Sequence, residues 1–245
     1  THNAAAAETR YVTEFQELYN GVDKQKITIN IEEMPSDQEY YNQMLVRASS
    51  NTLPDVFEGN NGVLELAVQN GIAVDMNPYV EADPEYAKEL GEDALEFGRN
   101  WEDGGLYNIS YGRQSIGYFY NKEMFANKGL EEPTADWTWD DLRNAAKTLT
   151  DADNNIYGLD LPVYDKNGGY TWNWLPFLWQ NGGEFLNDDR TEAVFNSPEG
   201  VEALEFWKKM VQEDKSVPLQ AAPTGVNRFT SGITAMVLDG PWSLN

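Results

Sequence analysis

The run FTSGITAMVLDGPW (residues 229–242) combines a helix end, a strand and a tight turn. VNRFTSG (residues 226–232) predicts a short helix that reaches Gly232. Ile233, Ala235 and Val237 then alternate with their neighbours, which is typical of a strand, before an Asp-Gly-Pro turn. A helix followed by a strand is the unit from which α/β folds are built.

Upstream segments repeat this order of elements. In KITINIEEM (residues 26–34) the isoleucines alternate and predict a strand. LPDVFEG (residues 53–59) predicts a second short strand, and NGVLELAVQNG (residues 61–71) predicts a helix that Gly71 closes. The alternation of strand and helix indicates an α/β fold with parallel strand pairing.

Helix caps mark two segments of the later chain. Thr138 and Asp141 predict the start of a helix through about residue 150, and Ser197 with Pro198 predicts another. Apolar spacing near the start of the chain predicts another helix, which ends near Gly21 and whose buried stripe consists of Tyr11, Val12, Phe15, Leu18 and Tyr19. In the helix after Ser197, the same spacing predicts a buried stripe of Val201, Leu204, Trp207 or Lys208, and Val211.

The charge of the chain excludes several partners. The 245 residues include 41 Asp and Glu against 17 Lys and Arg, a net charge of −24. Such a field opposes nucleic acid and anionic membranes and permits neutral or cationic ligands. With no cysteine there is no disulfide or thiolate site, and no apolar run approaches the length of a membrane span.

The familiar catalytic and metal-binding motifs are missing from the sequence. There is no nucleotide-binding glycine motif, and the single histidine, His2, excludes histidine triads and zinc sites. Asp151, Asp153 and Asn155 have the spacing of calcium ligands, but the sixth loop position is isoleucine and the twelfth is proline. We therefore predict a turn of Asp and Asn residues there, no metal, no cofactor and no catalytic residue.

Tryptophans cluster in YTWNWLPFLWQNGG (residues 170–183). Trp179 and Trp207 fit apolar helix faces and are expected in the core. Trp172 and Trp174 lie two positions apart and cannot share one helical stripe, and Trp242 follows the Asp-Gly-Pro turn. Flat rings with polar neighbours suit a sugar, although tryptophans in loops also pack against cores.

Seven motifs in this order carry a family resemblance: LPDVFEGNNG, VQNGIAVDMNPYV, GYFYNKEMF, WTWDDLRNAAKTLTD, FLWQNGGEF, FNSPEGVEALEFW and FTSGITAMVLDGPW. The chain resembles the extracytoplasmic solute-binding proteins of ABC importers, in the sugar-binding group that includes maltose-binding protein. The resemblance implies a type II periplasmic-binding-protein-like fold, with two α/β lobes and a ligand cleft between them. The expected lobes are residues 1–110 and 111–245, with a hinge strand near 108–114. Both are expected to be partial, since the family's first strand and C-terminal segments have no counterpart here.

The resemblance also implies a ligand site. Trp172 and Trp242 correspond to sugar-stacking aromatics of the family, and Trp174 is their neighbour. Gln114 corresponds to a polar sugar contact. The full set of expected ligand-binding residues is Glu58, Asn60, Asn61, Arg113, Gln114, Trp172, Trp174, Asp239 and Trp242.

The expected function is that of a carbohydrate-binding receptor of an ABC importer, which captures a mono- or oligosaccharide and delivers it to the membrane permease. The resemblance implies a monomeric, non-enzymatic protein in the periplasm or on the cell surface as a lipoprotein. Two alternatives stay open at this point. One is a secreted glycoside hydrolase that uses paired carboxylates, and the other is a receptor of the same fold for a peptide or polyamine.

Overall fold

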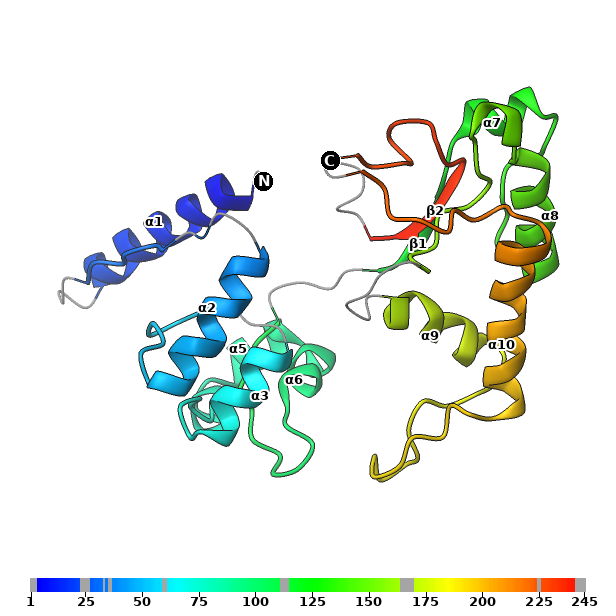
Figure 1. Cartoon of the computed structure of the whole chain (residues 1–245). Coiled ribbons are helices and arrows are strands. Elements are labelled where there is room, and N and C mark those ends of the chain that lie inside the picture. Colours follow the sequence, from blue (N-terminus) through cyan, green and yellow to red (C-terminus); the bar gives the residue numbers. More distant parts are fainter. Residues whose placement is uncertain are drawn as a thin grey trace. The chain divides into compact units, whose positions relative to one another are not determined.

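The computed structural model describes residues 4–22, 27–32, 34, 37–58, 61–110, 115–163, 170–223 and 226–240. The chain forms two compact units, Thr1–Arg113 and Gln114–Asn245 (Figure 1). Their identity as the two lobes predicted from sequence, at 1–110 and 111–245, stays a prediction. Residues 108–110 of the expected hinge lie in no strand, and residues 111–114 lie outside the described residues.

The described elements of the first unit are helical, and those of the second are mixed. The first unit contains α1 (Ala4–Val22), α2 (Asp37–Ser50), α3 (Asn61–Gln69), α4 (Asn77–Ala82), α5 (Pro84–Leu90) and α6 (Glu92–Gly98). The second contains β1 (Gly117–Tyr120), α7 (Lys122–Asn127), α8 (Trp139–Leu149), the 3-10 turn η1 (Ala152–Asn154), α9 (Tyr170–Gln180), α10 (Pro198–Lys208), the π-helical turn η2 (Lys209–Glu213) and β2 (Met236–Asp239).

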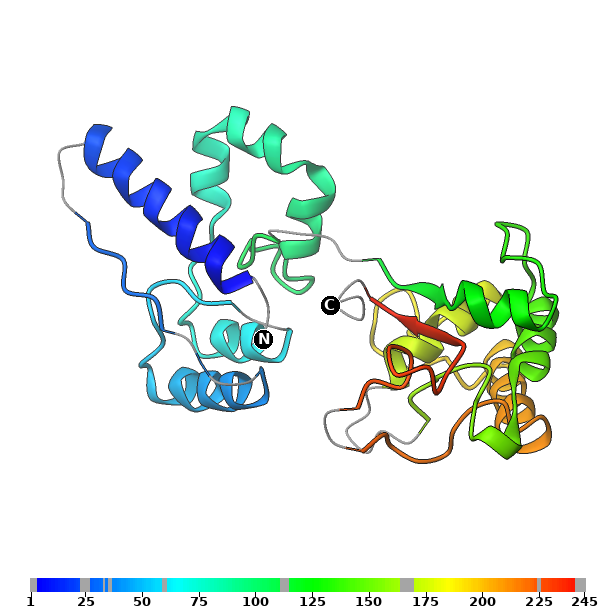
Figure 2. The ribbon, with the colours of Figure 1, turned by 90° about the horizontal axis from the view of Figure 1, so that it is seen from above.

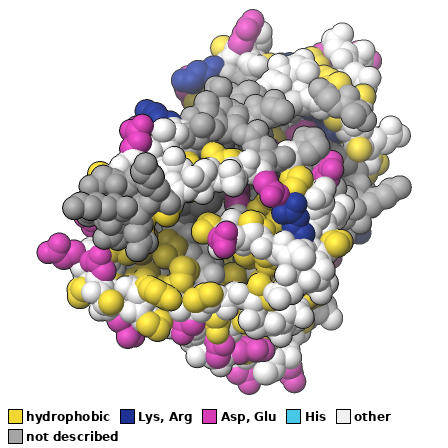
Figure 3. Space-filling model, turned by 90° about the vertical axis from the view of Figure 1, so that its left-hand side faces the viewer, with side chains coloured by type: hydrophobic (Ala, Val, Ile, Leu, Met, Phe, Trp, Pro, Cys, Tyr) yellow, Lys and Arg dark blue, Asp and Glu magenta, His cyan; other side chains and the backbone are white. Residues whose placement is uncertain are grey.

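The first helix forms as predicted, but its apolar stripe is not buried. Tyr11, Phe15 and Leu18 are 60%, 53% and 71% exposed. Figure 3 shows hydrophobic side chains gathered over part of the face that it presents, with acidic side chains around them. An amphipathic helix needs an apolar surface to pack against, and the described residues of this unit leave Val12 and Tyr19 only half-buried.

Both strands predicted in the first unit are wrong. Residues 27–32 and 53–58 form no strand, and Ile29 and Ile31 are exposed. A β-strand is stabilised by hydrogen bonds to a neighbouring strand, and the described part of this unit offers no partner for either segment. The small core here is instead helical, where α2 and α3 pack through Met44, Ala48, Val63 and Ala67.

The second unit holds the larger core around a short sheet. Strands β1 and β2 pair antiparallel, with Tyr118 opposite Leu238, so the predicted parallel pairing is wrong for this pair. Parallel contact exists only as the bridges from Tyr157 to Thr234 and from Asp160 to Val237, among the described residues. The strand predicted from Ile233 onward is confirmed in its second half as β2.

The capped helices of the second unit are confirmed. Thr138 and Asp141 form a reciprocal capping box at the start of α8. Ser197 accepts a hydrogen bond from the Gly200 amide at the start of α10, and Pro198 occupies its first turn. Figures 1 and 2 show α10 and α9 as neighbours in this unit.

The predicted stripe of the helix after Ser197 is confirmed at Trp207 and Val211, which are buried, and wrong at Val201 and Leu204. Val201 and Leu204 are exposed, whereas Gly200, Ala203, Phe206 and Trp207 are buried. A Cβ at Gly200 would lie 2.0 Å from the Phe195 carbonyl oxygen. The helix therefore approaches its neighbours on its small residues, which a count of large apolar side chains overlooks.

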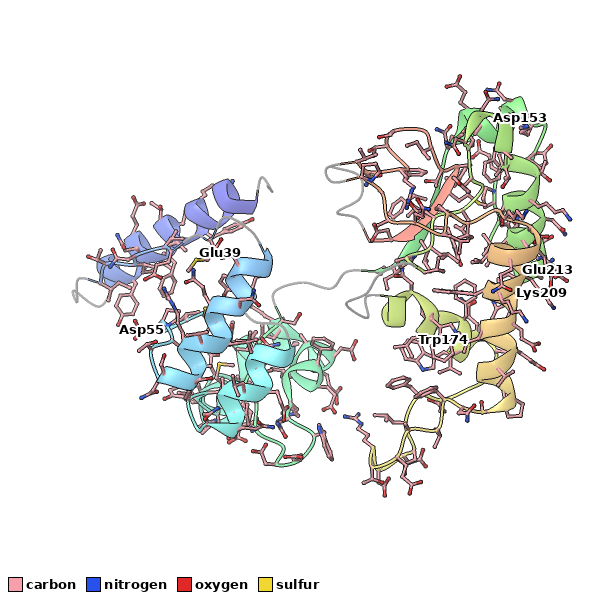
Figure 4. All side chains as sticks on the ribbon, viewed as in Figure 1. Glu39, Asp55, Asp153, Trp174, Lys209 and Glu213 are labelled. Atoms are coloured by element: carbon pink, nitrogen blue, oxygen red, sulfur yellow. The ribbon has the colours of Figure 1, made fainter. Side chains whose placement is uncertain are left out.

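The burial of the tryptophans in α9 and α10 agrees with the prediction at Trp207 but not at Trp179. Trp207 is buried as expected, and its ring meets Phe177 edge to face at 5.7 Å. Trp179, expected in the core, is 53% exposed, because Asn173, Trp174, Phe177 and Leu178 form the inner face of α9. Trp174 points from α9 toward the following loop (Figure 4), where its ring meets Phe195 edge to face.

Two turns complete the unit. The predicted Asp/Asn turn is confirmed, since the Asp151 side chain accepts from the Asn154 amide and Asn155 is left-handed at φ 59°. The helix predicted at residues 226–232 is instead a turn in which the Ile233 and Thr234 amides both donate to the Arg228 carbonyl. In the described part of the chain, none of the helices has the length and apolarity that crossing a membrane requires.

The π-helical turn η2 extends α10 and ends beside α8. The Asp214 amide donates to the Lys209 carbonyl, five residues back. The Asp214 side chain, 4% exposed, accepts hydrogen bonds from the Arg143 guanidinium at 2.5 and 3.1 Å. This ion pair connects α8 to the end of α10.

The Asp214 pair predicts an acid dependence of stability. Hydrogen bonds from Arg143 lower the pKa of the Asp214 carboxyl below its ordinary value of 3.8. The pair therefore stabilises the fold fully above that value, and its contribution is lost as the pH falls through the lower folded pKa. We expect wild type to lose stability over this acidic range, and Asp214→Asn to lose less. Urea unfolding at a series of acidic pH values checks this, and parallel acid losses in both proteins contradict it.

Candidate functional site

A concave pocket of about 290 Å³ lies in the second unit, beside β2 and α9. It is built where backbone hydrogen bonds bring distant segments together, such as that from the Asp160 amide to the Met236 carbonyl at 2.8 Å. The described lining consists of Asp160, Pro162, Asn173, Ala222, Val226, Asn227, Arg228, Val237, Leu238 and Asp239. A pocket with an apolar wall and a few converging polar groups is the usual form of a small-molecule site.

Asn173 is the most deeply buried polar residue of this lining, at 1% exposed. Its Nδ2 donates a hydrogen bond of 3.0 Å to the Leu238 carbonyl of β2. Its Oδ1 has no hydrogen-bond partner among the described residues. An unpaired buried acceptor costs about 1–3 kcal/mol, so Oδ1 is a favourable place for a donor from a ligand or from water.

Arg228 and Asp160 form a charged wall of the pocket. The Arg228 Nη1 atom lies 3.4 Å from Asp160 Oδ1, and Arg228 is 7% exposed. A second guanidinium nitrogen donates to the Gln220 carbonyl. The arginine is thus held by both a carboxylate and a backbone oxygen, which limits its movement toward the pocket.

Asp239 is the residue that both the sequence and the pocket identify. It ends β2, where it pairs with Gly117, and its Oδ1 accepts a hydrogen bond from the Gly240 amide at 2.8 Å. Glu58, by contrast, lies in the first unit, exposed, with its carbonyl accepting from the Tyr40 hydroxyl.

The remaining predicted site residues stay predictions. Asn60, Arg113, Gln114 and Trp242 lie outside the described residues. Asn61 begins α3 and Trp172 lies in the first turn of α9, where only their backbone is described. Trp174 is 7% exposed and packed in the core, so its accessible area for a ligand is small.

Sequence reasoning missed Asp160, Asn173 and Arg228. Asn173 stands between two tryptophans, and Arg228 lies in a predicted helix, but neither position carries a motif. The described residues contain no group of three or more His, Cys, Asp or Glu arranged to hold a metal ion. The pocket offers hydrogen-bond acceptors and donors, which suits recognition of a polar solute.

Comparisons with known proteins agree with this picture. The family model described as bacterial extracellular solute-binding protein matches residues 1–245. A Brucella abortus protein named as a binding protein is 25% identical over 223 residues, which cover 89% of this chain and 52% of the relative. The chain thus spans about half the length of the curated relatives it matches.

Solved structures show the same fold. An ABC substrate-binding protein from Listeria monocytogenes, in complex with cycloalternan, is 29% identical with a TM-score of 0.79, over 95% of this chain and 58% of that chain. A cyclic α-maltosyl-1,6-maltose binding protein from Arthrobacter globiformis is 28% identical with a TM-score of 0.74, over 96% and 57%. The chain therefore contains part of a type II periplasmic-binding-protein fold.

Proposed function

The chain belongs to the bacterial extracellular solute-binding proteins, and we propose that it is the carbohydrate-binding receptor of an ABC importer. The observation that carries the proposal is the pocket of the second unit, in which a buried amide acceptor, a held arginine and Asp239 surround one cavity. Sugar hydroxyls both donate and accept hydrogen bonds, so one sugar can use all three groups. The two structural neighbours named above bind cyclic sugars, which supports the same ligand class here.

The proposed receptor is a monomer that works outside the cytoplasm and delivers its ligand to a membrane permease. It binds without turning the ligand over, in line with a family of receptors. The net charge of −24 argues against nucleic acid as a partner. Among the site residues, Asp239 lines the pocket, and Trp172 and Trp242 are proposed to stack on sugar rings.

The first test is a titration of the intact chain with glucose, maltose, cycloalternan and cyclic maltosyl-maltose. Intrinsic tryptophan fluorescence detects binding and calorimetry measures its affinity. Saturable binding of one sugar, with no hydrolysis of it, is the expected result. Binding of a diamine or a peptide in place of every sugar would overturn the carbohydrate assignment, and turnover of a glycoside would overturn the receptor assignment.

Two tryptophan variants test the stacking residues. Trp172→Ala and Trp242→Ala should each weaken binding of the sugar found above by more than about tenfold, or about 1.4 kcal/mol. Trp179→Ala is the matched control, because Trp179 is an exposed tryptophan of the same helix as Trp172 and does not line the pocket. Calorimetry measures all three, and wild-type affinity in both test variants would remove the stacking roles.

A further inference from the structure

The side-chain amide of Asn173 is hydrogen-bonded through its nitrogen, whereas its oxygen has no hydrogen-bond donor among the described residues. A backbone carbonyl can only accept, so the 3.0 Å contact with the Leu238 carbonyl must be made by Nδ2. This contact sets the orientation of the amide and directs Oδ1 elsewhere. Oδ1 has no partner among the described residues, and Asn173 lines the pocket, so a group bound in the pocket is a candidate donor for Oδ1.

The other unpaired buried atoms do not share this position. Within the described part of the chain they are Trp174 Nε1, Trp207 Nε1 and Thr234 Oγ1, and none of these residues is in the described lining. Asn173 alone combines burial, an unpaired acceptor and contact with the cavity.

The charges around Asn173 select the kind of group that can bind. Asp160 and Asp239 place two carboxylates in the lining against one guanidinium, that of Arg228. The guanidinium already donates to Asp160 and to the Gln220 carbonyl. The two carboxylates would repel an anionic ligand group, whereas a ligand group that donates hydrogen bonds is compatible with a lining rich in acceptor oxygens.

We propose that Asn173 is a specificity-determining residue, whose Oδ1 accepts a hydrogen bond from a hydroxyl of the bound solute. The residue acts by direct contact with the ligand, and Leu238 holds its amide in the accepting orientation. This inference rests on the proposed function, because it assumes that the pocket receives the solute. It adds Asn173 to the proposed ligand-binding residues and specifies that the ligand donates the hydrogen bond to the protein.

The variant test compares two asparagines. Asn173→Ala is titrated by calorimetry with maltose, with putrescine as a cationic donor, and with glycerol 3-phosphate as an anion. Asn181→Ala is the matched control, since Asn181 follows the same helix and donates to the Glu199 carbonyl at 3.0 Å, away from the pocket lining. We expect maltose to bind at least tenfold more weakly to Asn173→Ala and within twofold of wild type to Asn181→Ala.

A second measurement needs no protein variant. Monodeoxyfluoro maltoses keep the size of each hydroxyl but cannot donate a hydrogen bond from that position. One such analogue should bind wild type at least tenfold more weakly than maltose. The same analogue should show less than twofold loss on Asn173→Ala, because the acceptor is already gone. If Asn173→Ala does not fold, the wild-type series still tests the inference, because no loss at any position would overturn it.

The outcomes separate this inference from the proposed function. Maltose binding that Asn173→Ala leaves unchanged, or a deoxyfluoro series with no loss at any position, overturns the role of Asn173 and keeps the receptor. Putrescine binding that needs Asn173, without maltose binding, keeps the acceptor role and overturns the carbohydrate assignment. Binding of glycerol 3-phosphate alone, or of none of these probes and none of the sugars titrated above, overturns both.

Discussion

Gly158→Ala is expected to lower the free energy of unfolding of the second unit by about 3 kcal/mol or more. An added Cβ would lie 1.8 Å from the Ala146 carbonyl oxygen and 2.4 Å from the Ala146 Cα. These are backbone atoms of α8, so no side-chain rotation can relieve the overlap. Either α8 or the segment that bridges to β2 has to move, and both carry the core of the unit.

Gly117→Ala is the matched control for this substitution. Gly117 lies in β1, and a Cβ built there meets no atom within 4 Å. We expect its effect to stay within about 0.5 kcal/mol, the usual range for a surface change. Urea unfolding of both variants, followed by circular dichroism, measures the difference. Similar stabilities for the two variants would show that α8 yields easily at this contact.

Arg143→Ala is expected to destabilise the second unit by about 3 kcal/mol. The substitution leaves the Asp214 carboxylate, 4% exposed, without the guanidinium that donates to both of its oxygens. A buried charge that loses its partner keeps the cost of its desolvation. The effect belongs near the lower end of such cases, because Arg143 itself is partly exposed.

Lys147→Ala separates this effect from loss of a surface charge. Lys147 Nζ lies 3.6 Å from the same carboxylate, but its side chain is 66% exposed. Exposed pairs contribute about 0–1 kcal/mol, so its removal should cost far less than that of Arg143. Chemical unfolding at neutral pH compares the two variants. Equal losses would mean that solvent reaches Asp214 more freely than its burial indicates.

The two capped helices of the second unit could be predicted because their signals are local, whereas the helix predicted at residues 226–232, which has no such cap, is a turn. Thr138 with Asp141 and Ser197 with Pro198 specify helix starts within a few residues. The strand expected at Ile27, Ile29 and Ile31 depends on a partner strand, and alternation alone does not supply one. The helix caps therefore predicted structure correctly, whereas the alternating pattern that needed a partner strand did not.

The inward faces of α9 and α10 were harder to predict than the helices themselves. Trp179 has the size of a core residue, yet it lies outside while Asn173 lies inside. Gly200 and Ala203 bring α10 close to its neighbours, although small residues add little to an apolar pattern. Which side of a helix is buried depends on shapes that the single segment does not contain.

The candidate site shows the same division. Asp239 could be found because it lies in a turn that the family resemblance marks. Asp160, Asn173 and Arg228 come from separate segments, which the bridges of β2 and the Asn173 hydrogen bond bring together. The sequence contains no motif that indicates that these three segments lie together. The unpaired Asn173 oxygen in the pocket lining could therefore be recognised only from the structure.

The π-helical turn Lys209–Glu213 determines how many residues separate α10 from Asp214. An α-helix advances by about 100° per residue, and a π turn contains one residue more than an α turn needs. Loss of a single residue between Lys209 and Glu213 (both labelled in Figure 4) would replace the bond from the Asp214 amide to a carbonyl five residues back with the four-residue bond of an α turn. Asp214 would then stay on nearly the same side of the helix axis, where Arg143 pairs with it. The turn can therefore absorb a one-residue difference in chain length while the end of α10 keeps its ion pair with α8.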